Sequence, residues 1–224
     1  MNSKSLIICP LKKELTYLCE EFSHLGWEFE KTSTGKLQYL FNRERNVVVA
    51  VGGHGKVQFG IQTSYLLNNL EKVEKVFCVG AGGGLAKHLK VGDLVVAEKT
   101  IEHDYEEKFD LNARLPEFFG HEELVLRAKN IEFDNFGVHF GAIASGDEDI
   151  VDERRAEELW KKTNALAVAW EGVGGARACI FNDVPFLEMR AITDNARNSV
   201  GESFLRNLPI AMKNSANFIN KILN

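Results

Sequence analysis

The sequence has few cysteines and prolines and no long apolar run. Only four cysteines and four prolines occur among 224 residues. The cysteines stand at 9, 19, 78 and 179 without a Cys-x-x-Cys pair, which argues against a disulfide framework and zinc spacing and indicates buried thiols in a reducing compartment. No segment approaches the ~18 apolar residues of a membrane helix, and MNSKSLIICPLKKEL has too short an apolar stretch for a signal peptide. We therefore expect a cytoplasmic protein with no membrane partner.

An excess of positive charge is also missing. The 27 Lys and Arg residues are outnumbered by 32 Asp and Glu, for a formal net charge of −5. Binding to a phosphate backbone needs clustered cations, so we expect no nucleic-acid partner. Hydrophobic residues make up 45% and charged residues 26%, which is typical of a globular chain that is long enough to bury a core. The totals predict one α/β domain over residues 1–224.

Short apolar runs alternate with helical patterns along the chain. Most of the runs lack strict polar alternation, as is typical of strands covered on both faces; they are residues 6–9, 47–51, 76–79, 94–97, 138–145, 166–170 and 186–192. A strand over 38–42 is predicted to pair with 47–51 across a polar turn. Helices are predicted at 12–23, 57–70, 153–162, 172–182 and 202–223. This order predicts an α/β fold, with a mixed or mostly parallel sheet between helices.

Two glycine-rich stretches fit no nucleotide-binding pattern. The stretch GAGGG at 80–84 would need glycine at 85 for a dinucleotide loop, where Leu85 stands. It forms either a tight turn or a backbone that approaches a small ligand closely. The stretch GGHGK at 52–56 lacks the flanking residues of a phosphate loop. The pair His103 and Asp104 has no third ligand at suitable spacing, so no metal site is predicted.

Single carboxylates stand just beyond three predicted strands: Glu14, Glu171 and Asp194. Taken singly, each is more often a helix cap or a surface charge. In sheets of this class, however, ligands bind at the carboxyl ends of the strands, so one rim could gather all three. Partial burial there raises the pKa of a carboxyl group, which suits proton transfer near neutral pH.

Several motifs resemble the purine nucleoside phosphorylase and nucleosidase superfamily, and most of all its 5'-methylthioadenosine/S-adenosylhomocysteine nucleosidase branch. They are VGAGGGL, KVGDLVVAEKTIEHD, IASGDEDIV, AWEG and PFLEMRAITDNA, in this order. The resemblance implies a three-layer α/β/α sandwich with a central mixed β-sheet, and a homodimer without cofactor or metal. It also implies hydrolysis of the N-glycosidic bond of a purine nucleoside. Methylthioadenosine or S-adenosylhomocysteine is then the expected substrate, with adenine as product and methionine salvage as the setting.

The resemblance assigns the main chemical roles. Asp194 matches the acid that protonates purine N7, with Arg190 and Thr193 as its supporting residues. Glu171 matches the carboxylate that holds the ribose hydroxyls. Glu14 matches the glutamate that orients and deprotonates the attacking water. An acid, a base and a hydroxyl acceptor are what a ribosyl cation-like transition state requires.

Further positions match the walls of the family's substrate site. The backbone of Ile150 matches the segment that reads the base edge, and Phe204 matches an aromatic near base and sugar. The other expected contacts are Ala81, Gly82, Asp149 and Thr193 for the base, His54 and Trp170 for the ribose, and Leu11 as a supporting residue.

Three of these wall residues depart from the family's pattern. Asp149 replaces an aromatic that stacks on adenine, Trp170 replaces a methionine, and His54 replaces an apolar residue near the 5' group. Asp149 is a candidate hydrogen-bond partner of a base amino group. Trp170 either contacts the nucleoside or packs in the core. The segment that a partner subunit normally supplies to the 5' pocket is here YEEKF, at 105–109.

Three alternative functions stay open. One is a nucleosidase for another 5' group, similar to futalosine hydrolase, and another is a purine nucleoside phosphorylase. The loop at 9–14 and Cys78 lack the phosphate-binding arginines of the phosphorylases, and Glu14 would repel phosphate, so hydrolysis is favoured. The third is a nucleoside-binding protein without catalysis, against which the three retained carboxylates argue.

Overall fold

The computed structural model describes residues 3–110, 113–197 and 200–224. Ten strands within these residues form a single sheet in the order β10-β6-β8-β9-β5-β1-β4-β3-β2, with β7 paired to β6. The strands are β1 (Lys4–Cys9), β2 (Glu30–Thr34), β3 (Leu37–Asn42), β4 (Val47–Val51), β5 (Val73–Gly84), β6 (Leu94–Glu102), β7 (Glu117–Phe119), β8 (Val138–Ser145), β9 (Ala167–Ala169) and β10 (Phe186–Asp194).

The sheet is mixed, as predicted, and part of it closes on itself. Strand β1 pairs in parallel with β4 and β5, whereas β2, β3 and β4 form an antiparallel edge. Strand β10 pairs in parallel with β5 and antiparallel with β6. Strand β6 also pairs with β8, β8 pairs with β9, and β9 pairs with β5. These five strands therefore form a closed ring. The ring brings the ends of β5 and β10 side by side.

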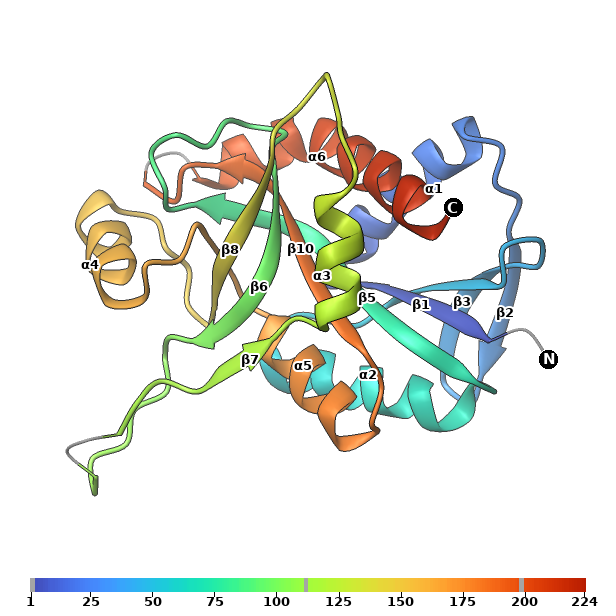
Figure 1. Ribbon diagram of the computed structural model, residues 1–224, viewed down its shortest axis with the longest axis horizontal. Coiled ribbons are helices and arrows are strands. Elements are labelled where there is room, and N and C mark those ends of the chain that lie inside the picture. Colours follow the sequence, from blue (N-terminus) through green and yellow to red (C-terminus); the bar gives the residue numbers. More distant parts are fainter. Residues whose placement is uncertain (1–2, 111–112, 198–199) are drawn as a thin grey trace.

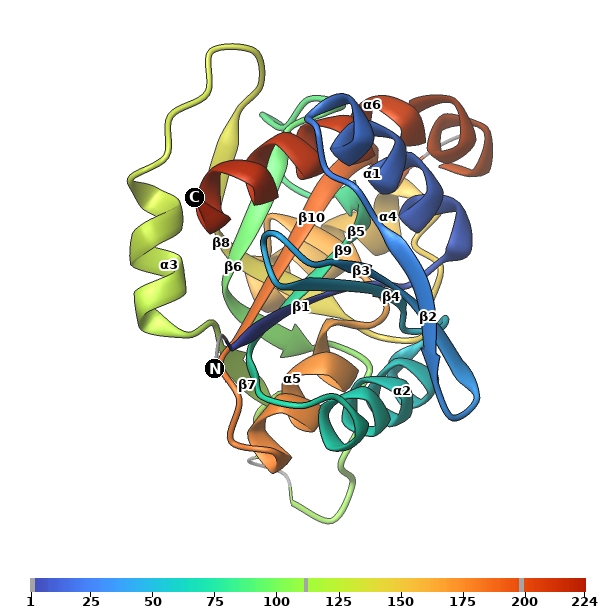
Figure 2. The same cartoon turned by 90° about the vertical axis from the view of Figure 1, so that its right-hand side faces the viewer.

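Helices cover both faces of the sheet, which confirms the three-layer sandwich. They are α1 (Lys12–His24), α2 (Lys56–Asn69), α3 (Glu122–Lys129), α4 (Glu153–Thr163), α5 (Gly172–Phe181) and α6 (Val200–Leu223). Helices α1 and α6 lie on one side of the strands, and α2 and α5 lie on the other (Figures 1 and 2). Strand β1 shows why: Ile7 packs in the core with Phe22 of α1, whereas Ile8 packs with Phe59 of α2. Alternate side chains of one strand therefore enter two cores.

The glycine-rich stretch at 80–84 is not a turn, so the tight-turn alternative of the sequence analysis is wrong. Strand β5 continues through it to Gly84. A methyl group at Gly80 would lie 2.8 Å from Arg190 Nη1 and 3.0 Å from Glu14 Oε1, and one at Gly83 would lie 3.1 Å from Asp194 Oδ1. The missing side chains thus leave room for charged groups beside an otherwise regular strand.

Three elements escaped the sequence prediction, namely β2, β7 and α3. Strand β2 has the sequence EKTST with no buried residue, since it is an edge strand with no apolar face to reveal it. Strand β7 is only three residues long. Strand β9 is shorter than the predicted 166–170 and spans Ala167–Ala169, because Trp170 already belongs to the turn into α5.

Candidate active site

A cavity of about 500 Å³ opens at the carboxyl ends of β1, β5, β9 and β10. Every residue that the sequence singled out for the site lines it: Leu11, Glu14, His54, Ala81, Gly82, Asp149, Ile150, Trp170, Glu171, Arg190, Thr193, Asp194 and Phe204. Segments from 10 to 204 therefore converge on one space of the size that suits a small-molecule ligand.

Glu14 is buried at the start of α1, with 2% of its surface exposed. Its Oε2 accepts the backbone N–H of Leu11 at 2.7 Å, and its Oε1 accepts that of Ala81 at 2.8 Å. Burial, followed by the charge of Glu171, raises the pKa of Glu14 to about 7, against the lowering effect of the two N–H groups and Arg190. Glu14 is therefore poised to exchange a proton near neutral pH.

Arg190 is the central cation of the site, and it is 1% exposed. Its Nη1 lies 3.1 Å from Glu171 Oε2, and its Nε donates to Glu188 Oε1 at 2.8 Å. The second oxygen of Glu188 accepts the hydroxyl of Thr100 at 2.5 Å. A buried charge with partners on both sides is held in one geometry, so Arg190 fixes the carboxylate of Glu171.

The other oxygen of Glu171 faces the mouth of the cavity. Oε1 accepts the N–H of Gly55 at 3.3 Å and lies 3.3 Å from His54 Nδ1. The His54 ring stacks on Trp170 with centroids 4.2 Å apart and an interplanar angle of 26°. The His54 side chain is 52% exposed, so a polar ring and an indole together form one wall.

Asp194 ends β10 and is held by two hydrogen bonds. The Thr193 hydroxyl donates to Oδ2 at 2.9 Å, and the N–H of Ala196 donates to Oδ1 at 2.8 Å. Asn207 of α6 donates to the Thr193 carbonyl at 2.7 Å and so fixes this turn. Burial raises the pKa of Asp194 in spite of these donors, which favours the protonated form that a general acid needs.

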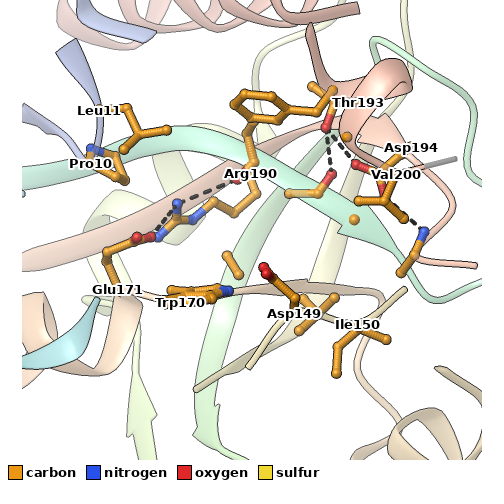
Figure 3. Close-up of a pocket in the computed structure, with 18 of the residues that line it drawn as sticks. Pro10, Leu11, Asp149, Ile150, Trp170, Glu171, Arg190, Thr193, Asp194 and Val200 are labelled. Carbon is orange, nitrogen blue, oxygen red and sulfur yellow. Dashed lines mark hydrogen bonds and ion pairs between the residues drawn. The ribbon is translucent and has the colours of Figure 1, made fainter. Parts of the chain in front are cut away.

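The Glu171–Arg190 pair and Asp194 occupy opposite ends of the cavity (Figure 3). Glu171 and Arg190 lie at one end, and Thr193 and Asp194 lie at the other (Figure 3). The side chains of Trp170, Asp149 and Ile150 form the wall between them, and Phe204 of α6 completes the lining. Asp149 is exposed, whereas Ile150 is buried.

The pair His103 and Asp104 lies outside this cavity. His103 is buried, and Asp104 pairs with Lys56 Nζ at 2.6 Å. Within the described parts of the chain, no group of three or more His, Cys, Asp or Glu side chains is placed to hold a metal ion. No described helix is long and apolar enough to cross a membrane.

Sequence reasoning missed two polar residues that support the site. Glu188 pairs with Arg190, and Ser145 donates to the Trp170 carbonyl at 2.8 Å while it accepts the N–H of Val173 at 3.1 Å. One signal was available: Glu188 and Arg190 are two apart on a strand, so their side chains share a face. Opposite charges on one face of an apolar strand indicate a buried ion pair.

The sequence profile of the phosphorylase superfamily matches residues 4–224. The 5'-methylthioadenosine/S-adenosylhomocysteine nucleosidase of Haemophilus influenzae is 34% identical over 78% of this chain and 80% of its own. The nucleosidase of the same name from Geobacillus kaustophilus is 31% identical over 98% of this chain and 96% of its own. Both relatives thus match most of their own length.

Solved structures of two nucleoside hydrolases have a similar fold. The 5'-methylthioadenosine/S-adenosyl homocysteine nucleosidase of Helicobacter pylori, crystallised with a pyrrolopyrimidine ligand, superposes with a TM-score of 0.88 at 30% identity, over 98% of this chain and 97% of its own. The futalosine hydrolase of the same species superposes with a TM-score of 0.87 at 29% identity, over 98% and 97% of the two chains.

Proposed function

Since the chain belongs to the phosphorylase superfamily, we propose that it is a purine nucleosidase that hydrolyses the N-glycosidic bond of 5'-methylthioadenosine, S-adenosylhomocysteine or both, and releases adenine. One observation carries the proposal: Glu14, Glu171 and Asp194 line a single cavity, and burial raises the pKa of both Glu14 and Asp194. The substrates are those named for the relatives.

Asp194 acts as the general acid in this proposal. As the bond between the sugar and the base breaks, electrons move into the purine, and a proton at N7 neutralises them. The Thr193 hydroxyl and the Ala196 N–H orient the carboxyl group, and burial favours its protonated form. General acid assistance is typically worth ~10²–10⁴-fold in rate.

Glu14 acts as the general base, and Glu171 binds the sugar. Ionised Glu14 takes a proton from water as the water attacks the anomeric carbon. The product is a free sugar hydroxyl, and the proton stays on Glu14 until solvent removes it. Glu171, whose Oε2 is held by the ion pair with Arg190, accepts hydrogen bonds from the ribose hydroxyls. Its negative charge also stabilises the positive charge that develops on the ribose ring.

Hydrolysis is favoured over phosphorolysis by the charges of the cavity. Among the described lining residues, Arg190 is the only Arg or Lys, and Glu171 and Glu188 already occupy it. Lys12 and Lys13 are exposed and do not belong to the lining. A phosphate ion would meet the carboxylate of Glu14 with no cation left to bind it.

A second candidate is a nucleosidase for a more polar 5' group, in the manner of futalosine hydrolase. The observation that favours it is the polar lining: the half-exposed imidazole of His54 and the exposed carboxylate of Asp149 both border the cavity. A polar 5' group could form hydrogen bonds with these side chains, which a purely apolar methylthio group could not.

A substrate screen tests the proposal. Methylthioadenosine, S-adenosylhomocysteine, adenosine, inosine and futalosine are each incubated with the protein, with and without inorganic phosphate, and the released base is quantified. We expect adenine from the first two without phosphate. Preference for futalosine would favour the second candidate, strict dependence on phosphate would indicate a phosphorylase, and binding without release would leave only a nucleoside-binding protein.

The raised pKa of Glu14 predicts how the stability of the fold depends on pH. Its pKa is raised from an ordinary 4.5 to about 7 in the fold, so the folded state binds more protons than the unfolded state between these values. The stability contributed by protonated Glu14 is present in full below pH 4.5 and is lost as the pH rises to about 7. The free energy of unfolding of the wild type, minus that of Glu14→Gln, should therefore fall by about 3 kcal/mol at most across this window. Urea titrations at several pH values measure it, and a constant difference would contradict the shift.

The proposal extends to a cytoplasmic homodimer in methionine salvage. All four cysteines are free thiols, which suits a reducing compartment. Val57, Ile61 and Tyr65 form an exposed stripe along α2 at 69%, 66% and 37% exposure, and α2 starts next to His54 at the cavity mouth. A second copy would cover this stripe. We expect Ile61→Asp to shift a dimer toward monomer in sedimentation velocity. The control Leu126→Asp on α3, where the leucine is 60% exposed, should not.

A further inference from the structure

A second cavity, of about 610 Å³, lies between α4 and the segment that follows β5. Its lining is Leu85, Ala86, Lys87, His88, Glu157, Trp160, Lys161, Asn164, Leu166 and Arg197, none of which lines the candidate active site. Helix α4 lies at one end of the molecule, beyond β8 (Figure 1). The cavity is thus a separate space, large enough for an organic molecule.

The floor of this second cavity is apolar, and one wall is aromatic. Leu85 and Ala86 form the floor and are 2% and 9% exposed. Trp160 of α4 is 43% exposed beside them. A large indole that borders a cavity and stays half open to solvent provides a face on which a flat ring can stack.

The rim carries positive charge on a protein whose net charge is −5. Lys87, Lys161 and Arg197 line the cavity, against Glu157 as the only acid among the described lining residues. Lys87 Nζ lies 3.8 Å from Glu157, which is a loose pair. Lys161 has no hydrogen-bond or ion-pair partner within the described ranges of the chain. The rim therefore attracts an anion.

Arg197 adds a cation that is already oriented. Its guanidinium donates to the carbonyls of Asn195 at 2.8 Å and Leu85 at 3.1 Å, and its side chain is 11% exposed. Its Nε lies 4.0 Å from the exposed carboxylate of Glu153, which is a loose pair. These bonds fix the guanidinium against the floor of the cavity. Arg197 therefore adds fixed positive charge beside the floor, while Lys161 and Lys87 stay available to a ligand.

We propose that this cavity binds a small organic anion with a flat aromatic body, which stacks on Trp160 and directs its negative group to Lys161 and Lys87. The aromatic wall and the cationic rim suit the two ends of such a molecule, and the apolar floor excludes water from its ring. This proposal does not depend on the proposed nucleosidase activity.

The test uses 8-anilinonaphthalene-1-sulfonate, a flat aromatic sulfonate, titrated by fluorescence and calorimetry with excess adenine present. We expect one molecule bound per chain, with Kd raised ~10-fold or more by Lys161→Glu and by Trp160→Ala. Lys31→Glu makes the same charge change on exposed strand β2 and should leave Kd unchanged. Each variant is first checked for an unchanged Tm.

Two results would overturn the proposal. Displacement of the probe by adenine would place it in the candidate active site. Equal Kd values for Lys161→Glu and Lys31→Glu, with Trp160→Ala also unchanged, would place it on some other apolar surface. The Kd values of the variants locate the probe without reference to adenine. The test therefore remains valid even if the nucleosidase proposal fails.

Discussion

Replacing Asp194 with asparagine should lower kcat for methylthioadenosine hydrolysis by ~10²–10⁴-fold. The amide has the volume of the carboxyl group, and its oxygen can still accept the N–H of Ala196, but it cannot give a proton to the leaving base. We therefore expect the fold and Tm to be nearly unchanged. Steady-state release of adenine, together with thermal unfolding, measures both quantities.

Two comparisons make the Asp194→Asn result specific. Asp183→Asn is the matched control, because Asp183 is exposed at φ +54°, a conformation that asparagine tolerates, and lies outside the cavity. A riboside with a 4-nitrophenolate leaving group needs no protonation, so its cleavage should suffer far less than that of methylthioadenosine. Equal losses for both substrates would contradict the role of Asp194 as the acid.

Glu14→Gln should reduce hydrolysis by a similar ~10²–10⁴-fold, because an amide cannot take a proton from water. A second effect follows from its contacts: both carboxylate oxygens accept backbone N–H groups, and the amide nitrogen of glutamine must face one of them. Loss of that hydrogen bond should cost about 1–3 kcal/mol of unfolding free energy. Above pH 7 the removal of the buried charge offsets this cost by up to about 3 kcal/mol, so the net loss should be seen below pH 4.5 and should shrink as the pH rises.

Binding measurements separate the two effects of Glu14→Gln. The variant should still bind adenine with a Kd close to that of the wild type, since the base lies toward Asp194 in the proposed arrangement. Glu20→Gln on the exposed side of α1 is the control and should change neither rate nor binding. Normal hydrolysis by the Glu14→Gln variant would exclude water activation by this residue.

The convergence of Glu14, Glu171 and Asp194 was predictable from the sequence because each follows a recognisable apolar strand. In an α/β sheet, the carboxyl ends of such strands meet at one rim. The helices at 12–23 and 172–182 were also predictable, because each directly follows one of these strands and carries its own helical pattern. These predictions depend on local sequence and on a general rule of sheet topology.

Other features depend on contacts between distant segments and could not be predicted in this way. The closed ring requires β10 to pair with both β5 and β6, and no local pattern specifies two partners. The stacking of His54 on Trp170 joins residues more than a hundred positions apart. The pKa of Glu14 depends on burial and on Glu171, and neither can be derived from the residues beside it.

Two main-chain N–H groups, that of Leu11 just after β1 and that of Ala81 in the neighbouring strand β5, hold Glu14 before any ligand arrives. For an inhibitor with a fixed positive charge at the anomeric position, the ionised Glu14 carboxylate is therefore a counter-ion that is already oriented. Its binding free energy would not be reduced by the cost of ordering that side chain. Such a molecule should bind more tightly as the medium becomes alkaline enough to ionise this carboxyl group. The Kd values of such inhibitors should therefore be measured both below and above pH 7.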